Sequence, residues 1–500
     1  MDWVSMEATE PDIDADGGVP LDTKVTSYSE SRPPSAPIER IPQDVLSLIF
    51  ITTSASIWNL RERKLFSLRV ASVSRSWRDL ALDISSLWST IYISLNFRPT
   101  PASIQLFLYL SRTHKLDIVI DWANADIGSR KASDSRYIFC AMDALIPHIS
   151  RWKSMSIAWD ISTCKGLEDT FVPLFVGNAS SLEHLQVFCF DYLFQPRRLN
   201  FFRKQFAAPH LSTLVLRAMP GGFSLNSIAE CFPGLEEFIW DQGVGFEHIN
   251  RWDAAGTFLK YLMPLVRLRL FCIVNLYIHD PRPERYMSSH LQTLLPALER
   301  LEIIGSKYEA VEDILAALTA PKLAEVLISN PELPFRSPFN GFWQQSTRFP
   351  VLRTLRLAAS CDAPDPEDIW EAFSGMHCVQ MTSSDYDDLV NLLRSWQEDW
   401  HFPKLTSLEF YCSPSLPIPV AMLRTFVSTR REVLAEHPNA GLGTILSIRV
   451  YTSATIADDD IKFFVDNVQD FRWTPELPQW DPGCSGVQGD YIAIRWVNSG

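Results

Sequence analysis

One six-residue pattern recurs along the chain and constrains its fold more than any other feature. The pattern is an apolar residue, two polar residues, an apolar residue, any residue and an apolar residue. Seven copies occur, at residues 182–187, 211–216, 235–240, 298–303, 323–328, 352–357 and 405–410. Most neighbouring copies begin 24–29 residues apart, and the alternating apolar residues in each copy indicate a short β-strand. A strand repeated at this spacing predicts stacked units that bury their apolar faces against their neighbours.

The repeated pattern resembles the L-x-x-L-x-L core of leucine-rich repeats. Proline precedes many copies, as at Pro209, Pro321 and Pro350, where it ends a helix and leads into an extended segment. Helical stretches are expected between strands, at residues 310–318 and 385–396. The resemblance implies an α/β fold, in which a small N-terminal helical module precedes a leucine-rich-repeat-like solenoid, a curved parallel sheet with outer helices.

The repeats are degenerate, because the asparagine that follows each strand in the consensus is mostly missing. The long gap between the copies that begin at Leu235 and Leu298 predicts one further repeat at residues 265–270. Weaker copies are expected at residues 155–159, 378–381 and 445–450.

The residues that precede the repeats follow a different pattern. Residues 41–50 have apolar side chains at helical spacing, with Pro42 at the first helical position and Asp44 in the first turn. A second helix is expected over residues 60–81, and a strand over residues 91–93. The acidic, Ser- and Pro-rich start of the chain has too few apolar residues to fold and is expected to be disordered. The expected division is a tail at 1–36, a helical domain at 37–95 and a solenoid at 96–500.

The expected helices resemble the F-box, a three-helix motif that docks on the Skp-family adaptor of cullin–RING ubiquitin ligases. The family opens with Leu-Pro-x-Glu/Asp-hydrophobic-Leu-x-x-Ile-Phe, and residues 41–50 read Ile-Pro-Gln-Asp-Val-Leu-Ser-Leu-Ile-Phe. The family's Val-x-x-Val-Cys-Arg-x-Trp-Arg-x-Leu-Ala is matched at residues 70–81, with Ser74 in place of cysteine. Ile41 in place of leucine and a longer connection at residues 51–64 are further departures. An F-box followed by degenerate leucine-rich repeats is similar to the large fungal F-box-like family.

The resemblance implies contact residues and partners for the helical module. The implied adaptor contacts are Pro42, Val45, Leu46, Ile49 and Trp77. Packing within the module is the alternative for each, and Trp77 is expected in the core, whereas Pro42 and Leu46 are expected to face the adaptor. The implied partners are the adaptor, a cullin bound through it, and a protein substrate.

The inner wall of the predicted solenoid is the expected place for that substrate. Outward positions of the repeats are held by Glu183, Gln186, Glu237, Arg300, Glu302, Arg353, Arg356 and Glu409. An ordinary solvated surface is the alternative for any one of them. Their signs are mixed and the net charge of the chain is -14, which disfavours binding to nucleic acid.

Motifs for catalysis, metal binding and cofactor binding are missing from the sequence. Residues 483–486 lack the spacing of a nucleophile elbow, and neither a phosphate-binding glycine loop nor His-Glu-x-x-His occurs. Residues 458–460, all aspartate, are expected to begin a helix rather than to hold a metal ion. No catalytic, metal or cofactor residue is therefore expected.

Cysteine usage and hydropathy bear on the compartment. The nine cysteines are scattered without a CxxC pair, which indicates a reducing compartment, cytoplasmic or nuclear. The apolar stretch at 262–278 contains Arg267 and Arg269 and is not expected to span a membrane.

The expected function is that of a non-catalytic substrate-recognition subunit of a ubiquitin ligase. The alternative is a repeat scaffold that acts outside a ligase.

Overall fold

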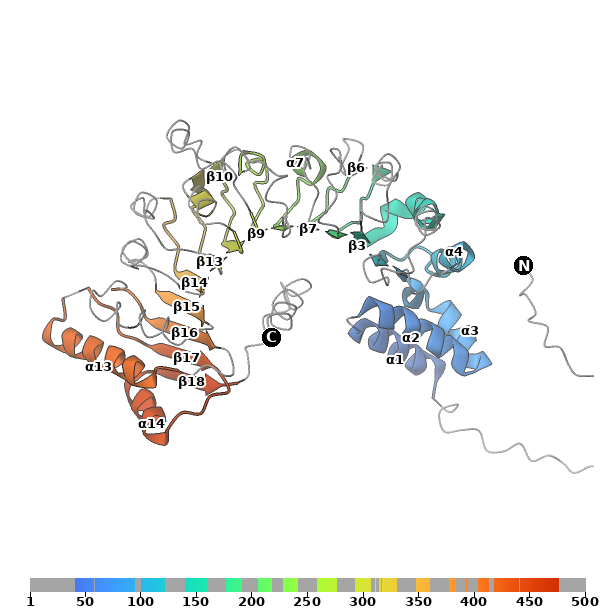
Figure 1. The fold of residues 1–500 in the computed structure, drawn as a ribbon. Coiled ribbons are helices and arrows are strands. Elements are labelled where there is room, and N and C mark those ends of the chain that lie inside the picture. The colour runs from blue at the N-terminus through green and yellow to red at the C-terminus, as the bar shows by residue number, and fades with distance from the viewer. Residues whose placement is uncertain are drawn as a thin grey trace, which may run out of the picture.

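The chain forms an arc, with helices at its N-terminal end and strands along its inner side (Figure 1). This architecture is that of a computed structural model. It describes residues 41–57, 59–94, 100–121, 140–160, 177–190, 206–217, 228–241, 259–276, 293–306, 311, 314–315, 317–330, 348–359, 377–383, 393, 403–412, 418–439 and 441–475. The expected tail at 1–36 and residues 483–486 lie outside these ranges.

Three helices form the N-terminal end of the arc, namely α1 Gln43–Ser56, α2 Leu60–Val73 and α3 Arg75–Asp83. Pro42 is the N-cap of α1 rather than its first residue. The side chain of Asn59 caps α2 by accepting the N–H of Glu62 at 3.1 Å. The single helix predicted over 60–81 is two helices, because Ser74 has an extended backbone (φ −155°, ψ 169°) and its hydroxyl accepts the N–H of Trp77 at 3.2 Å.

Within the described residues, one sheet of fourteen strands runs through the rest of the arc. Its strands are β1 Thr90–Ser94, β2 Leu116–Asp121, β3 Trp152–Asp160, β5 His184–Phe190, β7 Thr213–Arg217, β8 Glu237–Asp241, β9 Leu270–Val274, β11 Arg300–Ile304, β13 Glu325–Asn330, β14 Thr354–Ala359, β15 Cys378–Ser383, β16 Ser407–Cys412, β17 Ser447–Tyr451 and β18 Asp470–Thr474. The strands follow chain order, and each pair of neighbours is parallel. The predicted α/β fold with a curved parallel sheet is therefore confirmed (Figure 1).

Alternate side chains of each strand build a continuous core on the outer side of the sheet. Leu185 and Val187 of β5 are buried there, as is Leu182, which precedes the strand. The register of the strands keeps the buried positions side by side in successive units, since Leu185 lies opposite Leu214 of β7. The entry to β5 is also fixed, because the N–H of Glu183 donates to the carbonyl of Lys153 at 2.8 Å. The apolar pattern therefore serves as the packing surface of each unit.

The further repeat expected at 265–270 exists, but its frame is displaced by three residues. Phe271 of β9 lies opposite Leu301 and Ile273 lies opposite Ile303, so that the pattern begins at Leu268. Leu270, which the first frame put in the core, consequently faces the inner side of the sheet. The weaker copies expected at 155–159, 378–381 and 445–450 fall within or at β3, β15 and β17.

The outer side of the sheet is covered by helices and short strand pairs (Figure 1). These elements are η2 Ser85–Trp88, α4 Pro101–Leu110, η4 Ile146–Arg151, α7 Ile228–Cys231, α13 Val420–Glu436, α14 Asp458–Asn467, the pair β4 Gly177–Asn178 with β6 Phe206–Ala207, and the pair β10 Thr293–Leu294 with β12 Leu318–Thr319. The helix expected to begin at Asp458 is confirmed, with three aspartates in its first turn. Of the helical stretch expected at 310–318, the described residues 311, 314, 315 and 317 are helical, whereas residue 318 begins β12. Of 385–396, all but residue 393 lies outside the described residues.

Buried polar contacts join α2 to the start of the sheet. The ammonium of Lys64 donates to the carbonyl of Tyr92 at 2.8 Å. The hydroxyl of Ser67 donates to the carbonyl of Leu87, also at 2.8 Å. Strand β1 was assigned to the helical domain at 37–95, but it is the first strand of the sheet. The sheet thus begins inside the range that was expected to be helical.

Candidate functional site

Helix α1 exposes a row of large apolar side chains. Val45, Leu48, Ile49 and Ile51 have exposed fractions between 42% and 64%, and we call these four residues the α1 face. They lie on the side of α1 away from Phe50, which is buried. Apolar side chains gathered on one exposed helix face mark a surface that another protein can cover.

The α1 face contains two of the five residues that were implied as adaptor contacts. These are Val45 and Ile49, and Pro42 is exposed at the start of the same helix. Leu46 is 7% exposed and belongs to the core, so we now assign it to packing rather than to contact. Trp77 is half-buried, with its ring centroid 4.9 Å from that of Phe50.

Sequence reasoning missed the other two members of the α1 face. Leu48 was read as part of the apolar helix and Ile51 as the start of the connection at 51–64, although their exposed fractions are 64% and 42%. Their spacing would have shown them, because residues three or four apart lie on one side of a helix: Leu48 is three residues from Val45, and Ile51 is three residues from Leu48.

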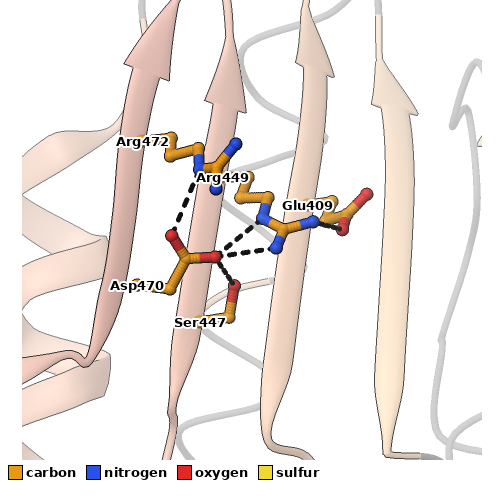
Figure 2. A network of polar contacts seen from close by, with 5 residues as sticks. All are labelled: Glu409, Ser447, Arg449, Asp470 and Arg472. Atoms are coloured by element: carbon orange, nitrogen blue, oxygen red, sulfur yellow. Dashed lines mark hydrogen bonds and ion pairs between the residues drawn. The ribbon is translucent and has the colours of Figure 1, made fainter. Parts of the chain in front are cut away.

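A chain of alternating charges crosses the inner wall at its C-terminal end (Figure 2). Arg449 of β17 bonds the carboxylate of Glu409 on β16 at 3.2 Å and that of Asp470 on β18 at 2.7 Å. Ser447 donates to Asp470 at 3.3 Å, and Arg472 donates to it at 3.2 Å. The hydrogen bond from Arg449 lowers the pKa of Asp470. Glu409 was predicted here, whereas its partners were not.

A second group of charges lies further along the wall. Arg300 contacts Glu302 on its own strand and lies 3.8 Å from Glu325 on β13. Arg356 of β14 pairs with the same Glu325. The structure therefore brings together three of the predicted wall residues. Glu325 was missed, although it holds the same repeat position as Arg300 and lies opposite it in the register.

The four remaining predicted wall residues lie apart from these two groups. Each has its own surroundings. Gln186 accepts from Ser156 at 3.4 Å, and Glu237 accepts from Thr213 at 3.2 Å. Glu183 precedes β5 and pairs with Lys115 at 2.6 Å.

Arg353 precedes β14, as Glu183 precedes β5, and it is exposed. These two residues are therefore at the entrance of their strands rather than in the middle of the wall.

The centre of the inner wall is apolar. Leu270, Cys272 and Val274 of β9 form a cluster separate from the main core, and Ile239 and Ile304 pack against it. All three β9 side chains are buried, and burial raises the pKa of the Cys272 thiol. This cluster was missed because the displaced frame assigned Leu270 to the core.

Across the described ranges, no group of three or more His, Cys, Asp or Glu side chains could hold a metal ion. Asp460 of the aspartate run pairs with Arg424 at 2.6 Å. No helix in the described part of the chain is long and apolar enough to cross a lipid bilayer.

Together, these features describe a mixed α/β chain built on one long parallel sheet, with an exposed apolar helix face at one end. No family model matches the chain, and no curated protein matches it. Among solved structures it is similar to a crystal structure of a TLR13–ssRNA13 complex, with a TM-score of 0.32 and 12% identity. The match covers 79% of this chain and 57% of that chain, so it spans less than two thirds of the neighbour's length.

Proposed function

We propose that the chain is a substrate-recognition subunit of a cullin–RING ubiquitin ligase. Helices α1, α2 and α3 act as an F-box that docks on a Skp-family adaptor. The sheet acts as a leucine-rich-repeat solenoid, whose inner wall binds a protein substrate. The α1 face is the observation that carries this proposal.

The exposure of the α1 face needs an explanation that packing within the module does not supply. The three-helix module has an apolar interior, in which Leu46 and Phe50 of α1 are buried. Side chains of α1 can therefore be buried within the module, yet those of the α1 face are not. Leaving four large apolar side chains in water forgoes about 25 cal/mol for each Å² that a partner could cover. The same helix carries the Pro-x-Asp-hydrophobic-Leu signature, which supports an adaptor as the partner.

The distribution of charge indicates how the wall would hold a substrate. Arg300, Glu302, Glu325 and Arg356 already neutralise one another, so a bound protein would gain little from their charges. Arg353 is exposed, and Arg472 has 64% of its side chain exposed at the end of the network in Figure 2. We therefore assign charge recognition to these exposed arginines.

In this proposal the chain is not itself an enzyme. Transfer of ubiquitin is accelerated because the substrate is held near the loaded conjugating enzyme, which raises its effective concentration. The hydrogen bonds from α2 to β1 and to η2 serve this role, since they hold the adaptor-binding end and the wall in one orientation.

Co-purification with a Skp-family adaptor tests the proposal. The variant Val45→Asp with Ile49→Asp places two charges on the α1 face without touching the core, and we expect it to lose the adaptor at least about a hundredfold. The matched control is Leu106→Asp on α4, an equally exposed leucine, which should bind as the wild type does. Wild-type chain that fails to bind the adaptor, or binding that survives the double change, would leave the alternative of a repeat scaffold outside a ligase.

A further inference from the structure

The residues that lead into successive strands of the sheet are joined by a ladder of backbone hydrogen bonds. The N–H of Arg353 donates to the carbonyl of Ala324 at 3.0 Å, and the N–H of His377 donates to the carbonyl of Arg353 at 3.1 Å. The N–H of Thr406 continues the ladder to the carbonyl of His377 at 2.9 Å. These bonds hold the entrances of β13, β14, β15 and β16 side by side, and we call this edge of the sheet the strand-entrance rim.

Exposed cations gather on the strand-entrance rim between β13 and β16. They are Lys322, Arg353 and Lys404, and we call these three residues the basic rim. Arg353 is itself a rung of the ladder, and each lysine lies two residues before the rung on its own strand. The ion pairs of the inner wall in this part of the sheet use other side chains. The wall therefore does not draw on the charge of the basic rim.

The described residues that enter these four strands contain no aspartate or glutamate. They are residues 320–324, 348–353, 377 and 403–406. Carboxylates on adjoining positions are already paired, Glu325 of the inner wall with Arg356, and Glu299 at the entrance of β11 with Arg269 at 2.8 Å. The whole chain has 59 acidic and 45 basic residues, so four successive entrances with cations alone depart from its composition.

We propose that the basic rim binds an acidic segment of a protein partner, rich in aspartate and glutamate, which lies across the entrances of β13 to β16. The inference rests on the proposed function in one respect, because it takes the sheet as the part of the chain that binds a protein. Three exposed cations on one edge complement such a segment, and complementary charge favours encounter with it over encounter with neutral or basic segments.

The spacing of the strands sets the length of the acidic segment. Neighbouring strands lie about 4.8 Å apart, so Lys322 at β13 and Lys404 at β16 are separated by about 14 Å along the rim. An extended chain advances about 3.3 Å for each residue, and about five residues therefore cover this distance. An acidic run of that length can reach all three cations of the basic rim at once.

A nucleic acid is a poorer match to the basic rim than an acidic protein segment. Binding to nucleic acid draws its affinity from many lysine and arginine contacts to phosphates, whereas the basic rim offers three cations. The chain also carries a net charge of -14, which repels a long polyanion. A short acidic segment extends little beyond the rim and so meets less of this repulsion.

Fluorescence anisotropy of the full chain with a labelled peptide tests the inference. The probe is a pentaglutamate peptide with Gly-Ser ends, and its neutral counterpart is pentaglutamine with the same ends. At low salt, Arg353→Gln with Lys404→Gln should weaken binding of pentaglutamate at least about fivefold, since two exposed charge contacts are lost. The matched control, Arg431→Gln with Lys462→Gln, removes the same charge from exposed positions of α13 and α14 and should bind as the wild type does.

Three outcomes would overturn the proposal. Pentaglutamate could bind the wild type and the rim variant equally, the matched control could lose as much affinity as the rim variant, or pentaglutamine could bind as tightly as pentaglutamate. A single-stranded DNA oligomer that binds the wild type more tightly than pentaglutamate would also overturn it and assign the rim to nucleic acid.

Co-purification with the adaptor separates this inference from the ligase proposal. The rim variant leaves the α1 face unchanged, so it should bind the adaptor as the wild type does. Selective binding of pentaglutamate by a chain that does not bind the adaptor would support the basic rim and remove the ligase proposal. Adaptor binding without selectivity for pentaglutamate would overturn the basic rim and leave the ligase proposal standing.

Discussion

The buried ammonium of Lys64 makes the stability of the chain depend on pH, and replacing it by methionine should remove that dependence. Lys64 is 5% exposed. Its ammonium donates to the carbonyl of Tyr92 and lies 5.4 Å from the ring centroid of Phe107. Burial lowers its pKa to about 8, from an ordinary value of 10.5, because the charged form has lost most of its water.

The sign of the effect follows from the lowered pKa. The unfolded chain holds this proton more tightly than the folded chain does, so protonation opposes folding. Below about pH 8 the lysine is charged in both states, and a shift of this size costs the folded state about 3 kcal/mol. As pH rises from about 8 to about 10.5 this cost is relieved. The contribution of Lys64 to the free energy of unfolding should therefore rise by about 2 kcal/mol between about pH 7 and about pH 9.5.

Urea denaturation of the wild type and Lys64→Met at these two pH values measures this contribution. Other titrating groups are common to both chains, so they cancel in the difference between the two free energies of unfolding. The difference should move by about 2 kcal/mol in favour of the wild type at the higher pH. Lys462→Met, at an exposed position of α14, should show no such change. A difference for Lys64→Met that stays constant with pH would refute the reasoning.

Two further predictions concern buried hydrogen bonds. Arg430 is 2% exposed, its guanidinium donates to the carbonyls of Gly443 at 2.8 Å and Pro403 at 2.6 Å, and burial lowers its pKa to about 10. Arg430→Met should destabilise the chain by about 3 kcal/mol in urea denaturation. It removes the arginine donor from the Gly443 carbonyl and one of two donors from the Pro403 carbonyl, which also accepts the N–H of Gly443. Arg431→Met at the exposed neighbour should change stability by less than about 0.5 kcal/mol. Ser306→Ala should cost about 1–2 kcal/mol, because the Ser306 hydroxyl accepts the N–H of Leu276 at 3.1 Å. Amide exchange at Leu276 should accelerate, and an unchanged rate there would contradict the role assigned to Ser306.

The parallel sheet could be predicted because its core positions repeat in both spacing and chemistry. The copies at 182–187 and 211–216 place leucine or valine at each buried site. Strand β2 was missed because Lys115 stands where the first apolar residue of the pattern should be. Strand β18 was missed although residues 468–473 fit the pattern, with phenylalanine and tryptophan at the positions that they also hold in the copy at 235–240. The displaced frame at β9 arose because two alignments fit the pattern, one with leucines at 265, 268 and 270 and the observed one with Leu268, Phe271 and Ile273.

The candidate surfaces could be predicted less completely than the fold. The F-box-like signature located α1, but it did not separate Leu46, which packs inward, from Val45 and Ile49, which are exposed. Partnerships on the inner wall needed the register, since Glu409 and Arg449 are 40 residues apart in the chain and meet only because β16 and β17 pair. The charged residues at the repeat positions therefore predicted a polar inner wall. Which of them form ion pairs and which are exposed could be seen only in the structure.

The order of the strands has a consequence for how the chain folds. Register partners are 23 residues apart between β17 and β18, and 40 apart between β16 and β17. Because each strand pairs with the next one in the chain, adding a unit does not lengthen the loops that the other units must close. Contact order relative to chain length is thus low for a parallel sheet, and the folding rate should depend on the formation of one adjacent pair rather than on the length of the whole array. A nucleus that forms anywhere along the arc can then grow in both directions.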